Sequence, residues 1–221
     1  MARRLPDGAG ARAEAVRVLE AGGLVAIPTD TVYGIAVALA TQGGIERLFA
    51  TKSRPPDKAI ALLLADAAQA SEIGELSSAA TALATAFWPG GLTLVVPRRL
   101  DRPLPLALTG GELAPGAIPT IGLRVPDHAA PRALARAVGP LPTTSANRSG
   151  EPELEDAEAI ERELGGALEL ILDGGPARGG TASTVVECTG DAVLILRVGA
   201  ISAEAIQSVV SPRRWGSATG P

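Results

Sequence analysis

Cysteine, histidine and aromatic residues are scarce in this sequence. Its 221 residues include one cysteine, Cys188, and one histidine, His128. A single cysteine excludes an intrachain disulfide, and one cysteine with one histidine cannot form a structural zinc site. Hydrophobic residues make up 46% of the chain, whereas aromatic residues make up only 2%. The core must therefore consist mainly of aliphatic side chains and alanine.

Long apolar runs and an excess of positive charge are also missing. No apolar segment is long enough to span a membrane, and the N-terminal residues lack the apolar stretch of a signal peptide. We therefore expect a soluble, cytoplasmic protein. The formal net charge of −4 argues against binding nucleic acid through overall electrostatic attraction, although it permits a local basic cleft. We expect a single domain over residues 1–210 and a flexible C-terminal tail at 211–221.

Lysine is rare in a chain that otherwise uses arginine. The only two lysines, Lys52 and Lys58, lie within one seven-residue segment, with Arg54 between them. Two lysines this close indicate a site that needs compact ammonium groups rather than planar guanidinium groups. Pro55 and Pro56 stiffen the segment, which suits the binding of a polyphosphate. A solvated, charged loop accounts for the same pattern.

Apolar segments of different lengths predict a mixture of strands and helices. We expect strands at 24–27, 59–64, 92–96, 120–125, 141–144, 168–172, 183–187 and 192–198, with a further apolar run at 35–40. We expect helices at 9–20, 45–51, 78–87, 127–138, 155–164 and 202–210. Residues 1–8 and 97–119 are expected to be irregular. Strands and helices do not alternate strictly, which favours an α+β or α/β-type fold with one twisted mixed sheet and flanking helices.

Small polar residues follow two of the expected strands. The segment Thr29-Asp30-Thr31 follows the first strand, and Ser145 and Asn147 follow a later one. Strand ends are where an open sheet presents binding residues. Ser145 and Asn147 offer uncharged hydrogen-bonding groups for a sugar, a base edge or a phosphate oxygen. The simpler alternatives are a hairpin turn that contains threonines and an Asx-type turn in which Asn147 bonds its own backbone.

Arg124 and Arg197 each lie within an apolar strand. A buried guanidinium group is costly unless it is paired or faces a cleft. Each arginine is therefore expected either to anchor a ligand or to form a structural ion pair. His128 at a helix start is expected to be a capping or surface residue, and Cys188 a small core residue. No Ser/His/Asp order or carboxylate pair stands out, which argues against hydrolysis through a side-chain nucleophile.

Seven short motifs, in order, resemble those of the YrdC/YciO-like family. They are Pro28-Thr-Asp-Thr-Val-Tyr-Gly34, Lys52-Ser-Arg54-Pro, Trp88-Pro-Gly-Gly-Leu-Thr-Leu94, Gly122-Leu-Arg-Val-Pro126, Ser145-Ala-Asn-Arg-Ser-Gly150, Ser183-Thr-Val-Val186 and Leu196-Arg-Val-Gly199. The resemblance covers residues 10–205. It implies a twisted sheet with a large concave cleft, and the length is similar to that of the short, single-domain members.

This resemblance also implies an activity. Family members of this kind convert L-threonine, bicarbonate and ATP into threonylcarbamoyl-adenylate and pyrophosphate, which makes them nucleotidyltransferases. ATP is then a substrate, and Mg²⁺ is held mainly through the triphosphate rather than by protein ligands. A partner enzyme transfers the threonylcarbamoyl group to an adenosine beside the tRNA anticodon. Direct binding of tRNA or double-stranded RNA is a further expectation.

Site residues follow from the resemblance by position. It assigns Thr31, Arg124 and Thr143 to threonine, with Arg124 pairing with the carboxylate. It assigns Lys52 and Arg54 to the triphosphate and to catalysis. Nucleotide-binding roles fall on Lys52, Arg54, Lys58, Thr120, Ser145, Asn147, Ser183 and Arg197.

Three positions depart from the family pattern. Lys58 stands where members often have asparagine, Leu63 where some have a histidine near threonine, and Glu153 in a turn that usually contains Ser-Pro. Two other functions therefore stay open. One is an RNA-binding module that holds tRNA or double-stranded RNA without this chemistry, and the other is a paralogue that uses another carbamoyl donor.

Overall fold

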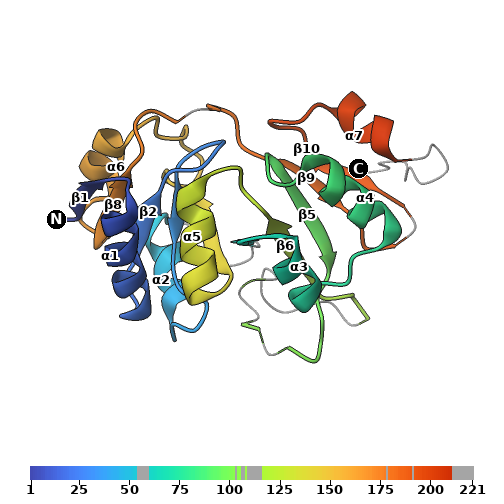
Figure 1. Cartoon of the computed structure of the whole chain (residues 1–221), viewed down its shortest axis with the longest axis horizontal. Coiled ribbons are helices and arrows are strands. Elements are labelled where there is room, and N and C mark those ends of the chain that lie inside the picture. The colour runs from blue at the N-terminus through green and yellow to red at the C-terminus, as the bar shows by residue number, and fades with distance from the viewer. Residues whose placement is uncertain are drawn as a thin grey trace.

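Ten strands of the described residues form one mixed sheet through the centre of the protein (Figure 1). This computed structural model describes residues 1–53, 60–102, 104–105, 108, 116–177, 179–190 and 192–210. The strands are β1 (Arg3–Pro6), β2 (Val25–Ile27), β3 (Gly34–Ala36), β4 (Ala61–Leu63), β5 (Leu92–Pro97), β6 (Thr120–Arg124), β7 (Leu141–Ser145), β8 (Leu170–Asp173), β9 (Thr184–Glu187) and β10 (Leu194–Arg197). Their order in the sheet is β1-β8-β2-β3-β7-β4-β6-β5-β9-β10.

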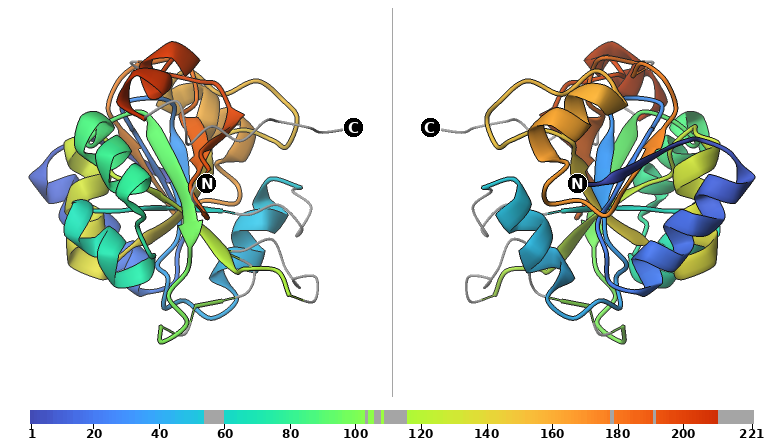
Figure 2. Two further views of the ribbon diagram at one scale, coloured as in Figure 1. Left: turned by 90° about the vertical axis from the view of Figure 1, so that its right-hand side faces the viewer. Right: turned by 90° about the vertical axis from the view of Figure 1, so that its left-hand side faces the viewer.

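Helices flank the sheet on both sides (Figure 2). Within the described residues they are α1 (Ala9–Glu20), α2 (Gly44–Thr51), α3 (Ala67–Ile73), α4 (Ser78–Phe87), α5 (Ala129–Val138), α6 (Ala157–Leu164) and α7 (Ala203–Val209). Figure 1 shows α1, α2, α5 and α6 over one half of the molecule and α3, α4 and α7 over the other. None of these helices is long and apolar enough to cross a membrane. The mixed sheet with flanking helices confirms the predicted α+β class.

The helices cover the two sheet faces unequally, and this leaves room for a cavity. One face of β2, β3, β7 and β8 packs against α1 and α5 through aliphatic side chains and alanines. Leu63 of β4 belongs to this cluster and also lines a cavity. Beyond Leu63, that face continues through β6 and β5, and β6 places Arg124 beside Leu63 in the parallel register. The cavity therefore begins where the α1–α5 layer ends.

Two elements differ from the expectation. Residues 1–8 were expected to be irregular, but Arg3–Pro6 pair with β8 as a parallel edge strand. Arg3 forms an ion pair with Glu14 of α1, and such charged groups and a proline are typical of edge strands. Helix α3 is also unpredicted, because its sequence is short and mostly polar or alanine. Asp66 begins it by accepting backbone N–H bonds at 3.1 and 3.3 Å.

Candidate functional site

A cavity of about 260 Å³ opens on the sheet face beside Leu63. Its floor is a row of paired residues across four strands: Thr143 of β7, Ala61 of β4, Gly122 of β6 and Val95 of β5. The small side chains in the middle of this row leave space above the sheet. Seven of the eleven predicted site residues line the cavity: Thr31, Thr120, Arg124, Thr143, Ser145, Ser183 and Arg197. Residues distant in the sequence thus meet at one place.

The threonines after β2 form an internally bonded turn at the cavity edge. Thr29 Oγ1 donates to the Val32 carbonyl at 2.7 Å and accepts from the Thr31 backbone N–H at 3.1 Å. The two threonine hydroxyl oxygens lie 3.1 Å apart. Both threonines are buried and line the cavity. The hydrogen bonds within the turn therefore hold both hydroxyl groups in fixed positions at the cavity edge. A simple hairpin turn would not need hydroxyl groups fixed in this way.

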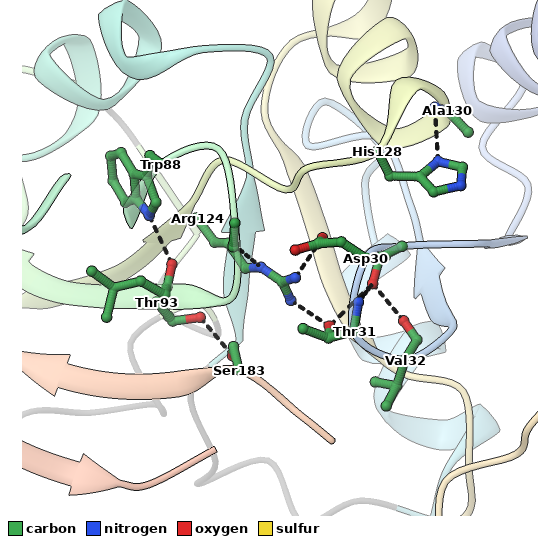
Figure 3. Close-up of polar contacts among 12 residues, drawn as sticks. Asp30, Thr31, Val32, Trp88, Thr93, Arg124, His128, Ala130 and Ser183 are labelled. Atoms are coloured by element: carbon green, nitrogen blue, oxygen red, sulfur yellow. Dashed lines mark hydrogen bonds and ion pairs between the residues drawn. The ribbon is translucent and has the colours of Figure 1, made fainter. Parts of the chain in front are cut away.

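Arg124 joins this turn to the opposite side of the cavity. Figure 3 shows its guanidinium group reaching from β6 to Asp30 and Thr31. Arg124 Nη2 donates to Asp30 Oδ1 at 2.7 Å, Nη1 donates to Thr31 Oγ1 at 2.8 Å and Nε donates to the Gly90 carbonyl at 3.0 Å. The Arg124 side chain is only 7% exposed. The expected ion pair is present and Arg124 also lines the cavity, whereas its role as a ligand anchor stays a prediction.

Burial and two charged neighbours act on the guanidinium group of Arg124. Burial lowers the pKa of Arg124, Asp30 opposes this effect, and the nearby Arg197 guanidinium lowers the pKa further. The influence of Arg197 shows that two cationic groups act on the same cavity. An anionic ligand between them would relieve their mutual repulsion.

On the other side of the cavity, Thr93, Ser183 and Arg197 are linked across β5, β9 and β10. The Thr93 and Ser183 hydroxyl oxygens lie 2.8 Å apart (Figure 3). Arg197 Nε and Nη2 donate to the Ser183 carbonyl at 3.2 and 2.8 Å, and Nη2 also reaches Ser183 Oγ at 3.3 Å. These contacts fix the start of β9 and aim a guanidinium group along the cavity wall.

Lys52 lies behind the cavity wall formed by β7. Lys52 is the residue directly after α2 in the chain, and it is 2% exposed. Lys52 Nζ donates to Thr144 Oγ1 at 3.2 Å, Ser145 Oγ at 3.1 Å, Asn147 Oδ1 at 3.0 Å and the Ser145 carbonyl. The ammonium group thus organises the polar turn after β7 and places a positive charge next to Ser145.

Asn147 makes a different contact from the Asx-type turn that its sequence allowed. Its Oδ1 accepts from Lys52 and, at 2.6 Å, from Ser145 Oγ, and its Nδ2 donates to the Glu151 carbonyl. Asn147 therefore links Lys52 to the segment that carries Glu153. Two predicted site residues, Arg54 and Lys58, lie outside the described residues.

Several cavity residues were not predicted as site residues. Thr29, Thr93, Thr144 and Glu153 line the cavity, and Asp30 supports Arg124. Thr93 had a weak signal, because it is a polar residue within an apolar strand. Glu153 is the one carboxylate in the described cavity lining.

Tyr33 holds the start of the connection between β8 and β9. It is 1% exposed, its hydroxyl donates to the Gly175 carbonyl at 2.6 Å, and it accepts from the Gly174 N–H at 3.0 Å. Burial raises the pKa of Tyr33, although the Gly174 N–H opposes this. The connection then leads to Ser183, so Tyr33 helps to fix one wall of the cavity.

The lone histidine and cysteine have the expected structural roles. His128 Nδ1 accepts the Ala130 N–H at 3.1 Å and caps α5. Cys188 is 1% exposed within the core, where burial raises the pKa of its thiol to about 11. A thiol with this pKa is a poor nucleophile near neutral pH.

Comparison with known proteins gives consistent matches over most of the chain. A family model, Sua5_yciO_yrdC, described as "Telomere recombination", matches residues 17–199. The threonylcarbamoyl-AMP synthase of Bacillus subtilis is 36% identical over 202 residues, which are 90% of this chain and 56% of that protein. The crystal structure of P. abyssi Sua5 complexed with L-threonine has a TM-score of 0.84 and 32% identity, covering 95% of this chain and 60% of the other. E. coli YciO has a TM-score of 0.81 and 25% identity, covering 93% of this chain and 100% of the other.

The chain spans little more than half the length of two of these relatives. It covers 56% of the Bacillus subtilis protein and 60% of the P. abyssi chain. The shared part contains the cavity and every predicted site residue.

Proposed function

Because the chain belongs to the Sua5/YciO/YrdC family, we propose that it synthesises threonylcarbamoyl-adenylate. The substrates are L-threonine, bicarbonate and ATP, and the products are threonylcarbamoyl-adenylate, pyrophosphate and water. This makes the protein a nucleotidyltransferase with one catalytic domain over residues 1–210. The main support is the cavity, where seven predicted polar residues from separate segments line one space.

The proposed binding roles assign one set of residues to the amino acid and another set to ATP. Thr31, Arg124 and Thr143 hold the amino acid, because Arg124 offers a fork of N–H groups that suits a carboxylate. We assign the triphosphate to Lys52 and Arg54. The nucleotide is positioned by Lys58, Thr120, Ser145, Asn147, Ser183 and Arg197. The names of relatives support the choice of substrates, since one is called a threonylcarbamoyl-AMP synthase and another was crystallised with L-threonine.

The chemistry requires orientation and charge neutralisation more than a strong base. The amine of threonine captures CO2 or bicarbonate as a carbamate, whose oxygen attacks the α-phosphorus of ATP while pyrophosphate leaves. A short-lived carbamate must be held next to the phosphorus, and the positive charges of Lys52 and Arg54 offset the charge that builds up on the phosphate oxygens. ATP enters with Mg²⁺ held mainly through its phosphates. This scheme needs no side-chain nucleophile.

We also propose the setting of the reaction. The product passes to a second enzyme that transfers the threonylcarbamoyl group to adenosine beside a tRNA anticodon, and both reactions take place in the cytoplasm. Direct contact with tRNA is a further part of this proposal.

Pyrophosphate release from ATP tests the proposed reaction. The purified chain should release pyrophosphate only when L-threonine and bicarbonate are both present, and L-serine in place of L-threonine serves as the control. Release without threonine, or faster release with carbamoyl phosphate, would identify a paralogue with another substrate.

A salt titration separates this function from RNA binding alone. Binding of tRNA that weakens steeply with salt, in a protein that releases no pyrophosphate, would favour the RNA-binding module. The net charge of −4 leads us to expect weak binding at physiological salt.

A further inference from the structure

Asp30 connects the turn after β2 to β6 without being part of the described cavity lining. Its Oδ1 accepts from Arg124 Nη2 at 2.7 Å, and the Asp30 side chain is 16% exposed. Arg124 and Thr31, the two residues that it lies beside in Figure 3, both line the cavity. Asp30 therefore acts on the cavity through Arg124.

The contacts of Arg124 leave a defined part of its guanidinium group for a ligand. A guanidinium group carries five N–H bonds. Asp30, Thr31 and the Gly90 carbonyl each take one of them, on Nη2, Nη1 and Nε respectively. Within the part of the chain that the structure describes, one N–H therefore stays available on each terminal nitrogen. Two N–H groups on the terminal nitrogens bind both oxygens of a carboxylate when they point from the same edge of the guanidinium plane.

The three contacts come from different parts of the fold. Asp30 and Thr31 belong to the turn after β2, whereas Gly90 lies in the turn before β5, where its N–H donates to the Val125 carbonyl at 2.8 Å. Of the three acceptors, only Asp30 carries a negative charge. Removing the carboxylate partner of a buried guanidinium group leaves a buried charge without compensation, which strongly disfavours the buried position of that group. Asp30 is thus the contact that keeps Arg124 inside the protein.

We propose that Asp30 is a positioning residue for the amino-acid substrate. It holds the plane of the Arg124 guanidinium group so that the two remaining N–H bonds are presented to the substrate carboxylate. This inference rests on the proposed function, since it specifies how the amino-acid end of that site is prepared before the substrate arrives.

The variant Asp30→Asn tests the proposal, with Asp7→Asn as its matched control. Asparagine keeps the size and an acceptor oxygen but removes the charge. Asp7 forms a similar pair outside the cavity, accepting from Arg12 at 2.7 and 2.6 Å, with the Asp7 side chain 11% exposed. In Asp30→Asn, we expect the KM for L-threonine to rise about tenfold, as for loss of a charged hydrogen-bond partner. The KM for ATP should change less than about twofold, and Asp7→Asn should change neither value.

Asp30→Glu provides a second variant that keeps the charge. Its carboxylate is displaced by one methylene group, so a positioning role predicts a raised KM for threonine here too. An unchanged KM for threonine in both variants would overturn the proposal. So would a parallel rise in the KM for ATP, because that result indicates general disruption of the cavity.

Hydrogen exchange at Arg124 Nε gives a readout that needs no substrate. The bond from Nε to Gly90 slows exchange of this hydrogen in the wild type, and NMR can follow it after assignment with Arg124→Lys. Loss of Asp30 should accelerate exchange about tenfold, whereas Asp7→Asn should leave it unchanged. An unaltered rate in the Asp30 variants refutes the positioning role. If the wild type releases no pyrophosphate, the proposed function fails. The exchange measurement still tests whether Asp30 keeps the Arg124 guanidinium group in place.

Discussion

Replacement of Lys52 by methionine should remove activity while leaving the fold largely intact. Methionine fills a similar volume without the ammonium group. Lys52 is 2% exposed, and its Nζ donates to oxygens of Thr144, Ser145 and Asn147. The substitution therefore removes a buried charge and leaves several acceptors without their donor.

The expected change in stability is small because two effects oppose each other. Each buried acceptor that loses its donor costs about 1–3 kcal/mol. Removing the buried ammonium group relieves a desolvation penalty of about several kcal/mol. Ser145 Oγ also keeps its bond of 2.6 Å to Asn147 Oδ1. We therefore expect the free energy of unfolding, measured with urea, to change by no more than about 2 kcal/mol.

The expected change in catalysis is much larger. Loss of one preorganised charge that stabilises developing negative charge lowers kcat by about 100- to 1000-fold, or about 2.7–4 kcal/mol. Threonine-dependent pyrophosphate release measures this effect. Arg47→Met is the matched control, since Arg47 lies on α2, the helix that Lys52 follows, is 44% exposed and pairs with Glu169 at the surface. The control should keep wild-type rates, and wild-type rates in Lys52→Met would refute the proposed role of the ammonium group.

Three further substitutions or treatments test the structural roles of single side chains. Tyr33→Phe removes the hydroxyl that contacts Gly174 and Gly175, so the free energy of unfolding in urea should fall by about 1–2 kcal/mol; an unchanged value would show that these bonds do not hold the connection. His128→Ala should cost about 1 kcal/mol through loss of the α5 cap, whereas His128→Asn should restore the stability in thermal unfolding. Cys188 should react slowly with thiol reagents at neutral pH and quickly after unfolding, because it is buried and its pKa is raised to about 11. Between the ordinary cysteine pKa and about 11, the thiol is protonated in the folded state but ionised in the unfolded state. The free energy of unfolding should therefore decrease as pH rises through this range. Fast labelling of the native protein would contradict both statements.

Local properties of the sequence were enough to predict most of the secondary structure and several residues that line the cavity. The apolar run before Pro28 predicted β2, and Asn147 was correctly expected to follow a strand, whereas Ser145 is the last residue of that strand, β7. These predictions succeed because burial and turn chemistry depend on neighbouring residues. The early strand β1 was missed because its stability comes from pairing with β8, more than 160 residues later in the chain.

The position of the cavity depends on strand order, which local patterns do not contain. Thr93, Arg124 and Arg197 meet because β6, β5, β9 and β10 are neighbours in the sheet. Family resemblance supplied part of this information for Arg124 and Arg197. It did not identify Thr93 or Asp30, because their roles become visible only when the hydrogen bonds between separate strands are known.

Lys52 and Arg124 are both buried cations, but they differ in how many of their N–H bonds the protein uses. The ammonium group of Lys52 has three N–H bonds and meets four protein oxygens, so it supplies positive charge and order to the turn after β7. A phosphate oxygen can contact it directly only by replacing one of these acceptors. Arg124 has five N–H bonds and gives three of them to the protein, so it keeps two directed donors. The same three acceptors would use every N–H of a lysine at this position, which fits the proposed roles of Arg124 in orienting a carboxylate and of Lys52 in supplying charge.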